Sequence, residues 1–381
     1  MASARKFNTA DVNDLKFLEN MKQELRQYFD TNHFTRFATL GIWAKAVFFF
    51  VGYLGCWSAL CFWLESPLAG LAFCLFMGFF GTGIALNIGH ESSHNVYSRH
   101  SWVNKFLYYF SMNLLGTYHH IWRLGHLQTH HTWVNVGGLD VGVDGGPLIR
   151  LNPQAPLKSW HRFQHFYAPA LYCFYTLLWT VSRDWKQLIK GEIAGIALYQ
   201  SYSEKWRRYF ELFILKAFYF FYILYLPLKY SHFNNAQILT GFVLMHVFFS
   251  LYLASLLFTS HLTTQVEFHK ADKDGTFELS FLRHQLSSTM DVNPQSSFAS
   301  FCLGGFNTHV VHHIYPHVSS AHYPALTKIL KNKCRQFHYP YIETDFFSAV
   351  VSHFSFLKLM GSQKHLAHST ALKMKEAISL S

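Results

Sequence analysis

Hydrophobic residues in this sequence are concentrated in four long stretches that contain almost no charged side chains. The stretches cover residues 46–64, 68–88, 212–228 and 236–260. An α-helix of about 20 apolar residues is long enough to cross the hydrocarbon core of a bilayer. Short polar breaks at residues 65–67 and 229–235 divide the four stretches into two pairs. The pattern therefore predicts two helical hairpins that span a membrane.

The remaining apolar positions predict shorter or interfacial elements. The runs at residues 106–115 and 166–181 are too short, or too closely flanked by polar residues, to be spans. Near the N-terminus, apolar residues recur every three to four positions (Val12, Leu15, Leu18, Met21, Leu25), which predicts an amphipathic helix lying on the membrane surface or facing water. We expect an all-α integral membrane protein with four transmembrane helices and a cytoplasmic helical cap. Its parts are an N-terminal interfacial segment (1–37), a membrane domain (38–345) and a C-terminal cytoplasmic tail (346–381).

Composition and charge agree with a membrane location. Only 14% of the residues are charged, against about 25% in soluble domains. The net charge is +11, with basic residues before the first and third stretches and none in the first hairpin loop. Positive loops favour the cytoplasmic side, so both termini and residues 89–209 are expected there. The basic residues form no compact Lys/Arg run of the kind that would suggest nucleic-acid binding. The six cysteines are scattered and form no CxxC pair that would indicate a disulfide framework or a zinc site.

Histidine is the unusual residue of this chain, with 25 copies, many of them clustered. The three clusters are His90–His94 (HESSH), His126–His131 (HLQTHH) and His309–His313 (HVVHH). Residues three or four apart share one face of a helix, so each cluster presents several imidazoles in one direction. Imidazole suits iron, zinc, copper and nickel alike, so the spacing does not name the metal. Because the second hairpin returns the chain to the side it left, all three clusters are expected at one membrane face.

These clusters closely resemble the three histidine boxes (Hx3H, Hx3HH and HxxHH) of integral-membrane fatty acid desaturases. The similarity runs from about residue 40 to 325 and includes Trp122-Arg123, Asn135, His165–Pro169, Arg283–Leu286, Gly304–Asn307 and Pro316. The chain leans toward the front-end, linoleoyl-CoA desaturase-like subgroup, in a form without a fused cytochrome b5 domain. It departs from the family in having Glu91 where Asp is usual, and from that subgroup in opening the third box with His309 in place of Gln. The position of the double bond therefore stays open.

The resemblance implies a di-iron centre held by the box histidines and one further histidine upstream of the third box. The implied ligands are His90, His94, His126, His130, His131, His284, His309, His312 and His313. Metal-bound imidazoles generally need hydrogen-bond partners on their second nitrogen. The residues expected to give such support are Glu91, Asn135, Asp140, Asp144, Asp291 and Asn307. His246, in the middle of the fourth stretch, is expected to be a buried polar contact instead of a ligand.

The activity implied by the resemblance is O2-dependent introduction of a C=C bond into a fatty acyl chain carried by coenzyme A or by a lipid. The protein would supply geometry and a dry cavity, and the metals would supply the oxidising power. The sequence has no HPGG-type cytochrome b5 motif and no cysteine set for an iron–sulfur centre. We therefore expect an external electron donor, a cytochrome b5, ferredoxin or rubredoxin-like protein, docking on the basic cytoplasmic surface.

Three alternatives remain at this point. Residues 90–94 match HExxH, the signature of a zinc protease, although that function leaves the other two clusters unexplained. A metal transporter is expected to place polar ligands within its spans, and these spans hold few besides His246. The nearest alternative is a fatty acid hydroxylase or ketolase, because those oxygenases share the histidine scaffold.

Overall fold

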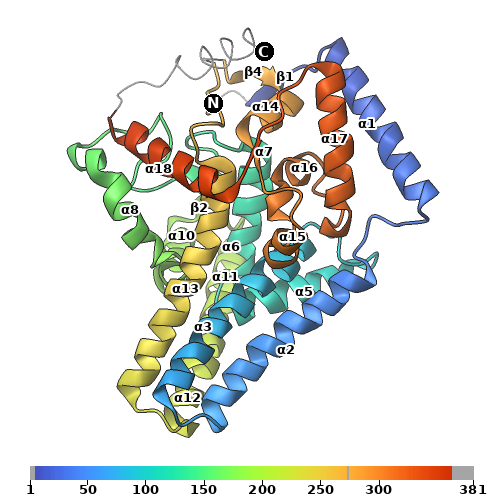
Figure 1. Ribbon diagram of the computed structural model, residues 1–381. Helices are drawn as coiled ribbons and strands as arrows, with labels where there is room; N and C mark the ends of the chain where they lie inside the picture. Colours follow the sequence, from blue (N-terminus) through green and yellow to red (C-terminus); the bar gives the residue numbers. More distant parts are fainter. Residues whose placement is uncertain (1–4, 273, 363–381) are drawn as a thin grey trace.

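The computed structural model describes residues 5–272 and 274–362, and its longest elements are four helices arranged as two hairpins (Figure 1). The first hairpin pairs α2 (Leu40–Phe62) with a helix that runs from Pro67 to Ser93. The second pairs a helix that runs from Tyr202 to Tyr230 with α13 (Asn235–His261). All four are long and apolar enough to cross a membrane. The predicted pair of spanning hairpins is confirmed, and each helix begins earlier than its apolar stretch.

Two of the long helices contain π-helical turns. Such turns are rare, and they occur frequently at functional sites. The second long helix consists of α3 (Pro67–Ile84), the π-helical turn η1 (Ala85–His90) and α4 (Glu91–Ser93). The third consists of α11 (Tyr202–Phe220), the π-helical turn η6 (Phe221–Tyr225) and α12 (Leu226–Tyr230). The turn η1 ends on His90, the first histidine of the first box.

Helix-capping chemistry explains the tight ends of both hairpins. The Ser66 side chain accepts a hydrogen bond from the backbone N–H of Ala69, and Pro67 occupies the first position of α3, where its missing N–H costs nothing. The second hairpin turns at Asn234, which forms a reciprocal capping box with Gln237 at the start of α13. Each loop is therefore closed by the residues that begin the returning helix.

Short helices and two short strands connect the second long helix to the third. None of these elements is long enough to run from one end of the hairpins to the other. The run predicted at residues 166–181 is broken into several pieces, so it does not span, as expected. The elements are α5 (Ser101–Leu114), α6 (His119–Arg123), η2 (Leu124–His130), α7 (His131–Trp133), η3 (Val141–Val143), η4 (Ser159–Phe163), α8 (Gln164–Tyr172), α9 (Tyr175–Leu178), η5 (Trp179–Arg183), α10 (Asp184–Lys190), β2 (Glu192–Ile193) and β3 (Ile196–Ala197).

The chain after α13 builds most of the cap that covers the upper end of the hairpins in Figure 1. Its elements are β4 (Thr276–Ser280), α14 (Phe281–Ser288), β5 (Asp291–Val292), α15 (Ser297–Leu303), η7 (Phe306–Thr308), α16 (His309–Ile314), η8 (Ser320–His322), α17 (Tyr323–Phe337), β6 (Glu343–Thr344) and α18 (Phe346–Ser362). The strands form three two-stranded sheets: β4 pairs in parallel with β1 (Lys6–Asn8), β5 in parallel with β6, and β2 antiparallel with β3. The described part of the protein is thus mostly helical.

The N-terminal amphipathic helix exists as α1 (Val12–Thr31), but the predicted apolar face is only partly right. Phe17, Met21 and Leu25 are buried, in the hydrophobic cluster that includes residues of α17, whereas Val12 and Leu15 are 67% and 58% exposed. The buried face also contains the carboxylate of Asp14, which polarity alone would place outside. The helix is therefore packed on the cap and does not form a separate interfacial segment.

Asp14 is buried because it has partners there. Its Oδ1 accepts a hydrogen bond from Arg283 Nε at 2.9 Å and another from the Tyr339 hydroxyl. These contacts join α1 to α14 and to the chain that follows α17. The ion pair turns the helix so that Phe17 and Met21 face inward.

The C-terminal region also departs from expectation. Residues 346–362 form α18, which packs against α8, η4 and α13. Phe356, Leu357 and Met360 are buried there. Residues 346–362 of the expected tail are therefore packed against the rest of the structure, and residues 363–381 lie outside the described residues.

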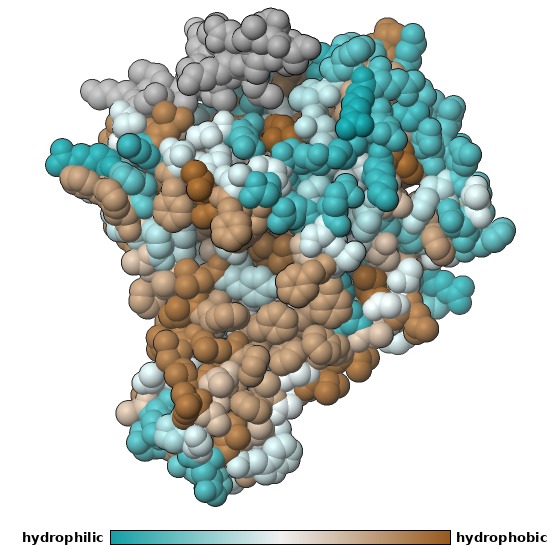
Figure 2. All heavy atoms as spheres, in the orientation of Figure 1, coloured by the Kyte–Doolittle hydropathy of each residue, from teal (hydrophilic) through white to brown (hydrophobic). Residues whose placement is uncertain are grey.

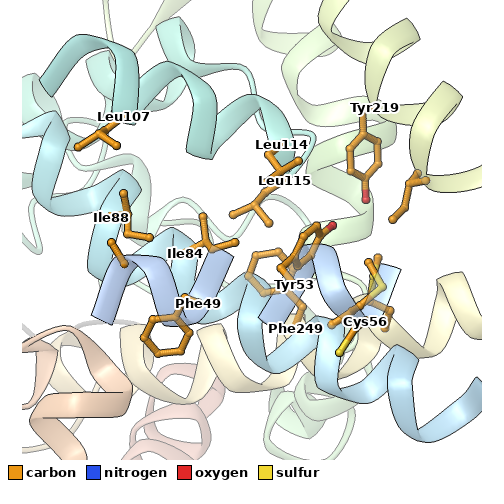
Figure 3. Close-up of a cluster of buried hydrophobic side chains, with 14 of the residues drawn as sticks. Phe49, Tyr53, Cys56, Ile84, Ile88, Leu107, Leu114, Leu115, Tyr219 and Phe249 are labelled. Atoms are coloured by element: carbon orange, nitrogen blue, oxygen red, sulfur yellow. The ribbon is translucent and has the colours of Figure 1, made fainter. Parts of the chain in front are cut away.

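The main hydrophobic cluster lies between the two hairpins and beneath the cap. Figure 3 shows Phe49 and Tyr53 of α2, Ile84 of α3 and Phe249 of α13 directed into this cluster. Figure 2 shows hydrophobic side chains over most of the hairpin region and hydrophilic ones over the cap. The surface thus divides into a lipid-compatible part and a water-compatible part.

A buried ion pair fixes the third long helix to the connecting segment. Lys216 Nζ lies 2.6 Å from Asp184 Oδ2 and 2.6 Å from the carbonyl oxygen of Gly116. Asp184 also accepts hydrogen bonds from the Tyr118 backbone N–H and the Trp179 indole, both at 2.9 Å. This arrangement satisfies both charges in a site closed to water.

We expect Lys216→Met to destabilise the protein by about 3–5 kcal/mol, because it leaves the Asp184 carboxylate buried without its countercharge. Thermal unfolding in detergent would show a lower midpoint, and adding Asp184→Asn would recover part of the loss. Lys186→Met, at an exposed position of α10, is the matched control. Equal midpoints for Lys216→Met and the control would contradict the stabilising role of the pair.

Candidate metal centre

The three histidine boxes lie at the same end of the hairpins, opposite the hairpin loops. The first box spans η1 and α4, at the end of the second long helix. The second box lies on the π-helical turn η2 and α7, and the third on α16. In Figure 1, α7 and α16 lie above the ends of α3 and α13. The topology therefore brings the boxes together, as the hairpin arrangement predicts.

The structure gathers nine histidines into two adjacent groups. Within each group one nitrogen of every ring lies within 4.8 Å of the others. Group one consists of His90, His94, His126, His131 and His312; group two consists of His130, His261, His309 and His313. The groups touch, because the rings of His131 and His313 stack with centroids 4.5 Å apart.

The spacing of the ring nitrogens in group one fits a bound metal. His126 Nε2 lies 3.1 Å from the Nε2 atoms of both His94 and His131, and His131 Nε2 lies 3.0 Å from that of His312. A neutral imidazole carries a single N–H, so one nitrogen cannot donate to two neighbours that both present lone pairs. Adjacent ligands of one ion at metal–nitrogen distances of about 2.1 Å are separated by roughly 3.0 Å at a right angle.

Group two shows the same arrangement. His309 Nε2 lies 2.7 Å from His261 Nε2 and 3.2 Å from His313 Nε2. A cation shared among these lone pairs relieves their mutual repulsion. Both groups therefore fit a metal ion.

Burial keeps these imidazoles neutral. It lowers the pKa of His94 to about 3, and the charge of Arg123 acts in the same direction. Burial likewise holds the pKa of five further box histidines well below the usual value: His126, His131, His309, His312 and His313. A metal binds the neutral ring, so no proton has to be displaced at neutral pH.

Hydrogen bonds on the far ring nitrogens orient four of the rings. His130 Nδ1 lies 3.1 Å from Asp140 Oδ2, and the other three rings find neutral partners. These are the Tyr323 hydroxyl for His312 at 2.8 Å, Gln285 Oε1 for His313 at 2.9 Å and the Ser288 carbonyl for His261 at 3.2 Å. Such partners fix the tautomer and leave the other nitrogen free for a metal.

Of the acidic residues expected to support the ligands, Asp140 does so directly. Burial raises the pKa of the Asp140 carboxyl, but the His130 imidazole and the backbone N–H groups of Gly142 and Asn135 hold it below its usual value. Asp144, by contrast, is exposed and accepts a hydrogen bond from the Gly146 backbone N–H. Among the described residues, no hydrogen bond joins Asp144 to a histidine, so the structure gives no support for the role expected of it.

Glu91 and Asp291 position backbone instead of imidazoles. Glu91 accepts hydrogen bonds from both the hydroxyl and the backbone N–H of Ser320, at 2.7 and 3.1 Å, and from the Ser319 hydroxyl. It therefore fastens the first box to the turn after the third. Asp291 accepts from the Val310 backbone N–H at 2.8 Å and from Tyr341, which fixes the start of α16.

The two asparagines also act on backbone. Asn135 Nδ2 donates to the carbonyl oxygens of His261, Glu267 and Ser288. Asn307 Nδ2 donates to the Asn293 carbonyl at 3.3 Å and contacts the Ser300 hydroxyl. Neither amide contacts a ligand ring.

The structure places the ninth ligand expected from the sequence outside both groups. His284 is buried in contact with Phe7 and His269, outside both groups. His261, the last residue of α13, takes its place in group two. Sequence reasoning missed His261 because it stands alone at the end of an apolar stretch. Its position, at the end of a span on the side of the boxes, is the signal that could have found it.

His246 and Glu91 bear on the alternative functions. His246 is buried, with one ring nitrogen 2.9 Å from the Thr176 hydroxyl and the other 2.9 Å from the Tyr219 hydroxyl, so it is a polar contact as expected. Glu91, the base that a zinc protease would need, is held by the two serines. Neither residue supports transport or proteolysis.

Comparisons with known proteins agree with the site. A family model described as fatty acid desaturase matches residues 65–345. The acyl-lipid (8-3)-desaturase of Physcomitrium patens is 28% identical over 92% of this chain and 73% of its own length. The sn-1 linoleoyl-lipid 6-desaturases of Arthrospira platensis and of Synechocystis sp. are 24% and 25% identical, over 90% and 91% of this chain and 92% and 95% of theirs.

The family model covers well over half of the chain and includes all three boxes, and the relatives align along most of its length. Together with the four apolar helices and the two histidine groups, these matches show that the chain belongs to the fatty acid desaturase family, whose members are metal-dependent membrane oxidoreductases that desaturate fatty acyl chains.

Proposed function

We propose that this protein is an O2-dependent, di-iron acyl-lipid desaturase with its metal centre on the cytoplasmic side. The observation that carries the proposal is the pair of adjacent histidine groups at one end of the membrane hairpins. Relatives named as acyl-lipid and linoleoyl-lipid desaturases favour a lipid-linked acyl chain over a coenzyme A thioester. The basic flanks of the spans support the cytoplasmic placement.

Group one and group two would each hold one iron ion. Bound iron, with O2, supplies the oxidising power that removes hydrogen from an unactivated methylene, which side chains cannot provide. In the overall reaction, –CH2–CH2– and O2 take up two electrons and two protons and yield –CH=CH– and two molecules of water. Imidazole nitrogens are suitable ligands for iron.

The residues of this chain hold and shield the site. Asp140, Gln285 and Tyr323 orient ligand rings, and Glu91 and Asp291 fix the backbone that carries them. Burial of the groups excludes bulk water from the reacting centre. The two electrons come from a carrier protein, a cytochrome b5, ferredoxin or rubredoxin-like donor, attracted to the basic cytoplasmic surface.

We expect purified protein loaded with iron to form double bonds in lipid-linked acyl chains when a reduced carrier protein and O2 are supplied. Gas chromatography with mass spectrometry of the released fatty acids measures the product. The zinc-loaded protein should be inactive, because zinc has no redox chemistry. Equal activity with zinc alone would contradict the proposal, and hydroxylated products would favour an oxygenase.

His261→Ala and His284→Ala separate the ligand that we propose from its place in group two from the one expected from the sequence. We expect His261→Ala to lose the iron of group two and with it the activity, whereas His284→Ala keeps both irons. Metal content per chain, measured by mass spectrometry, reports the outcome. Loss of iron in His284→Ala alone would contradict the assignment.

Asp140→Asn is expected to lower metal affinity by roughly 10–100-fold, because partners of ligand imidazoles typically contribute that much. Competition with a chelator, read as metal retained per chain, measures the change. Asp144→Asn is the matched control, a nearby carboxylate that contacts no described histidine. Similar retention in both variants would show that the Asp140–His130 bond does not support the metal.

A further inference from the structure

The side chain of Phe306 lies against both histidine groups. Its ring centroid is 4.5 Å from that of His90 and 6.0 Å from that of His312 in group one, and 5.0 Å from that of His309 in group two. The ring is 5% exposed. Phe306 therefore packs against both places where metal would be held.

Two glycines fix the backbone that carries this ring. Gly304 and Gly305 both have positive φ angles, 60° and 83°, which favour glycine. A Cβ on Gly304 would lie 3.0 Å from the carbonyl oxygen of Leu86, and one on Gly305 would lie 2.8 Å from Tyr323. The backbone of this loop therefore packs closely between the end of the second long helix and α17. We expect the backbone to be rigid there, so that a change of conformation would involve the side chain of Phe306.

On its other side, Phe306 joins an apolar cluster at the membrane end of the cap. Buried Leu86 and Leu256 belong to this cluster, and Tyr252, Leu253, Leu257 and Leu303 pack against it. These residues come from the ends of two spans and from α15. The outer face of α15 carries Phe298 and Phe301, which are 78% and 42% exposed. Through Phe306, this cluster is in contact with both histidine groups.

The space beside the ring is too small for an acyl chain. A cavity of about 10 Å³, room for one water-sized molecule, is bordered by His90, His94, His312 and Phe306. Several methylenes need far more volume. A hydrocarbon chain that approaches the metals from the apolar cluster must displace or pack on the ring of Phe306.

We propose that Phe306 positions the acyl chain over the metal centre and thereby determines which carbon–carbon bond is desaturated. The inference rests on the proposed desaturase function. It assigns to Phe306 the apolar contact that sets how far the chain advances past the two histidine groups. Shortening the side chain would let the chain advance or shift by one or more methylenes.

The test compares Phe306→Ala and Phe306→Leu with the wild-type protein and with Phe298→Ala, an exposed position of α15. All four proteins are supplied with the same lipid substrate, donor and O2, and both double-bond position and iron per chain are measured. We expect both Phe306 variants to keep their iron and to change the ratio of double-bond positions by roughly 10-fold, the discrimination typical of one methylene in an apolar pocket. Phe298→Ala should give the wild-type ratio.

An unchanged ratio in both Phe306 variants overturns the inference. Loss of iron or of turnover in both variants also overturns it, because Phe306 would then serve only to pack the ligand rings. A wild-type protein that forms no double bonds contradicts the desaturase function itself, so the two failures are distinguishable.

Discussion

The structure depends on bringing nine imidazole rings together in a largely buried place. Ring nitrogens separated by about 3 Å repel one another through their lone pairs unless a cation lies between them. Burial disfavours protonation, which would otherwise set positive charges against each other. The protein must therefore hold the rings from outside, and most of the polar contacts around the site serve that purpose.

The membrane topology supplies the first part of this support, and local hydrogen bonds supply the rest. Two hairpins deliver the first box and His261 to the same end, with π-helical turns where the first and second boxes begin. Glu91 then fastens the first box to Ser319 and Ser320, which follow the third. Asp291 fixes the start of α16. The boxes are distant in sequence, yet each is fixed to another by a buried carboxylate or amide.

Sequence alone predicts the spans and the boxes because both are local patterns. A stretch of apolar residues and a histidine spacing can be recognised without knowing what lies beside them. Eight of the nine histidines brought together were predicted in this way. No such local pattern marks His261, Gln285 and Tyr323. Each contacts a histidine of the third box that lies outside its own local segment, 48, 28 and 11 residues away. The face of α1 was misjudged for the same reason, since Asp14 is buried only because Arg283 meets it there.

His261 makes group two depend directly on a membrane-spanning helix. It is the last residue of α13, so any shift of that helix along its axis moves a ring of group two. Asn135, in the left-handed conformation that asparagine tolerates, binds the carbonyl oxygens of both His261 and Ser288, and Ser288 in turn accepts from the His261 ring. The same asparagine donates its backbone N–H to Asp140, the partner of His130. One asparagine, through its side-chain amide and its backbone N–H, thus supports two rings of group two: His261 at the end of a long helix and His130 in the connecting segment.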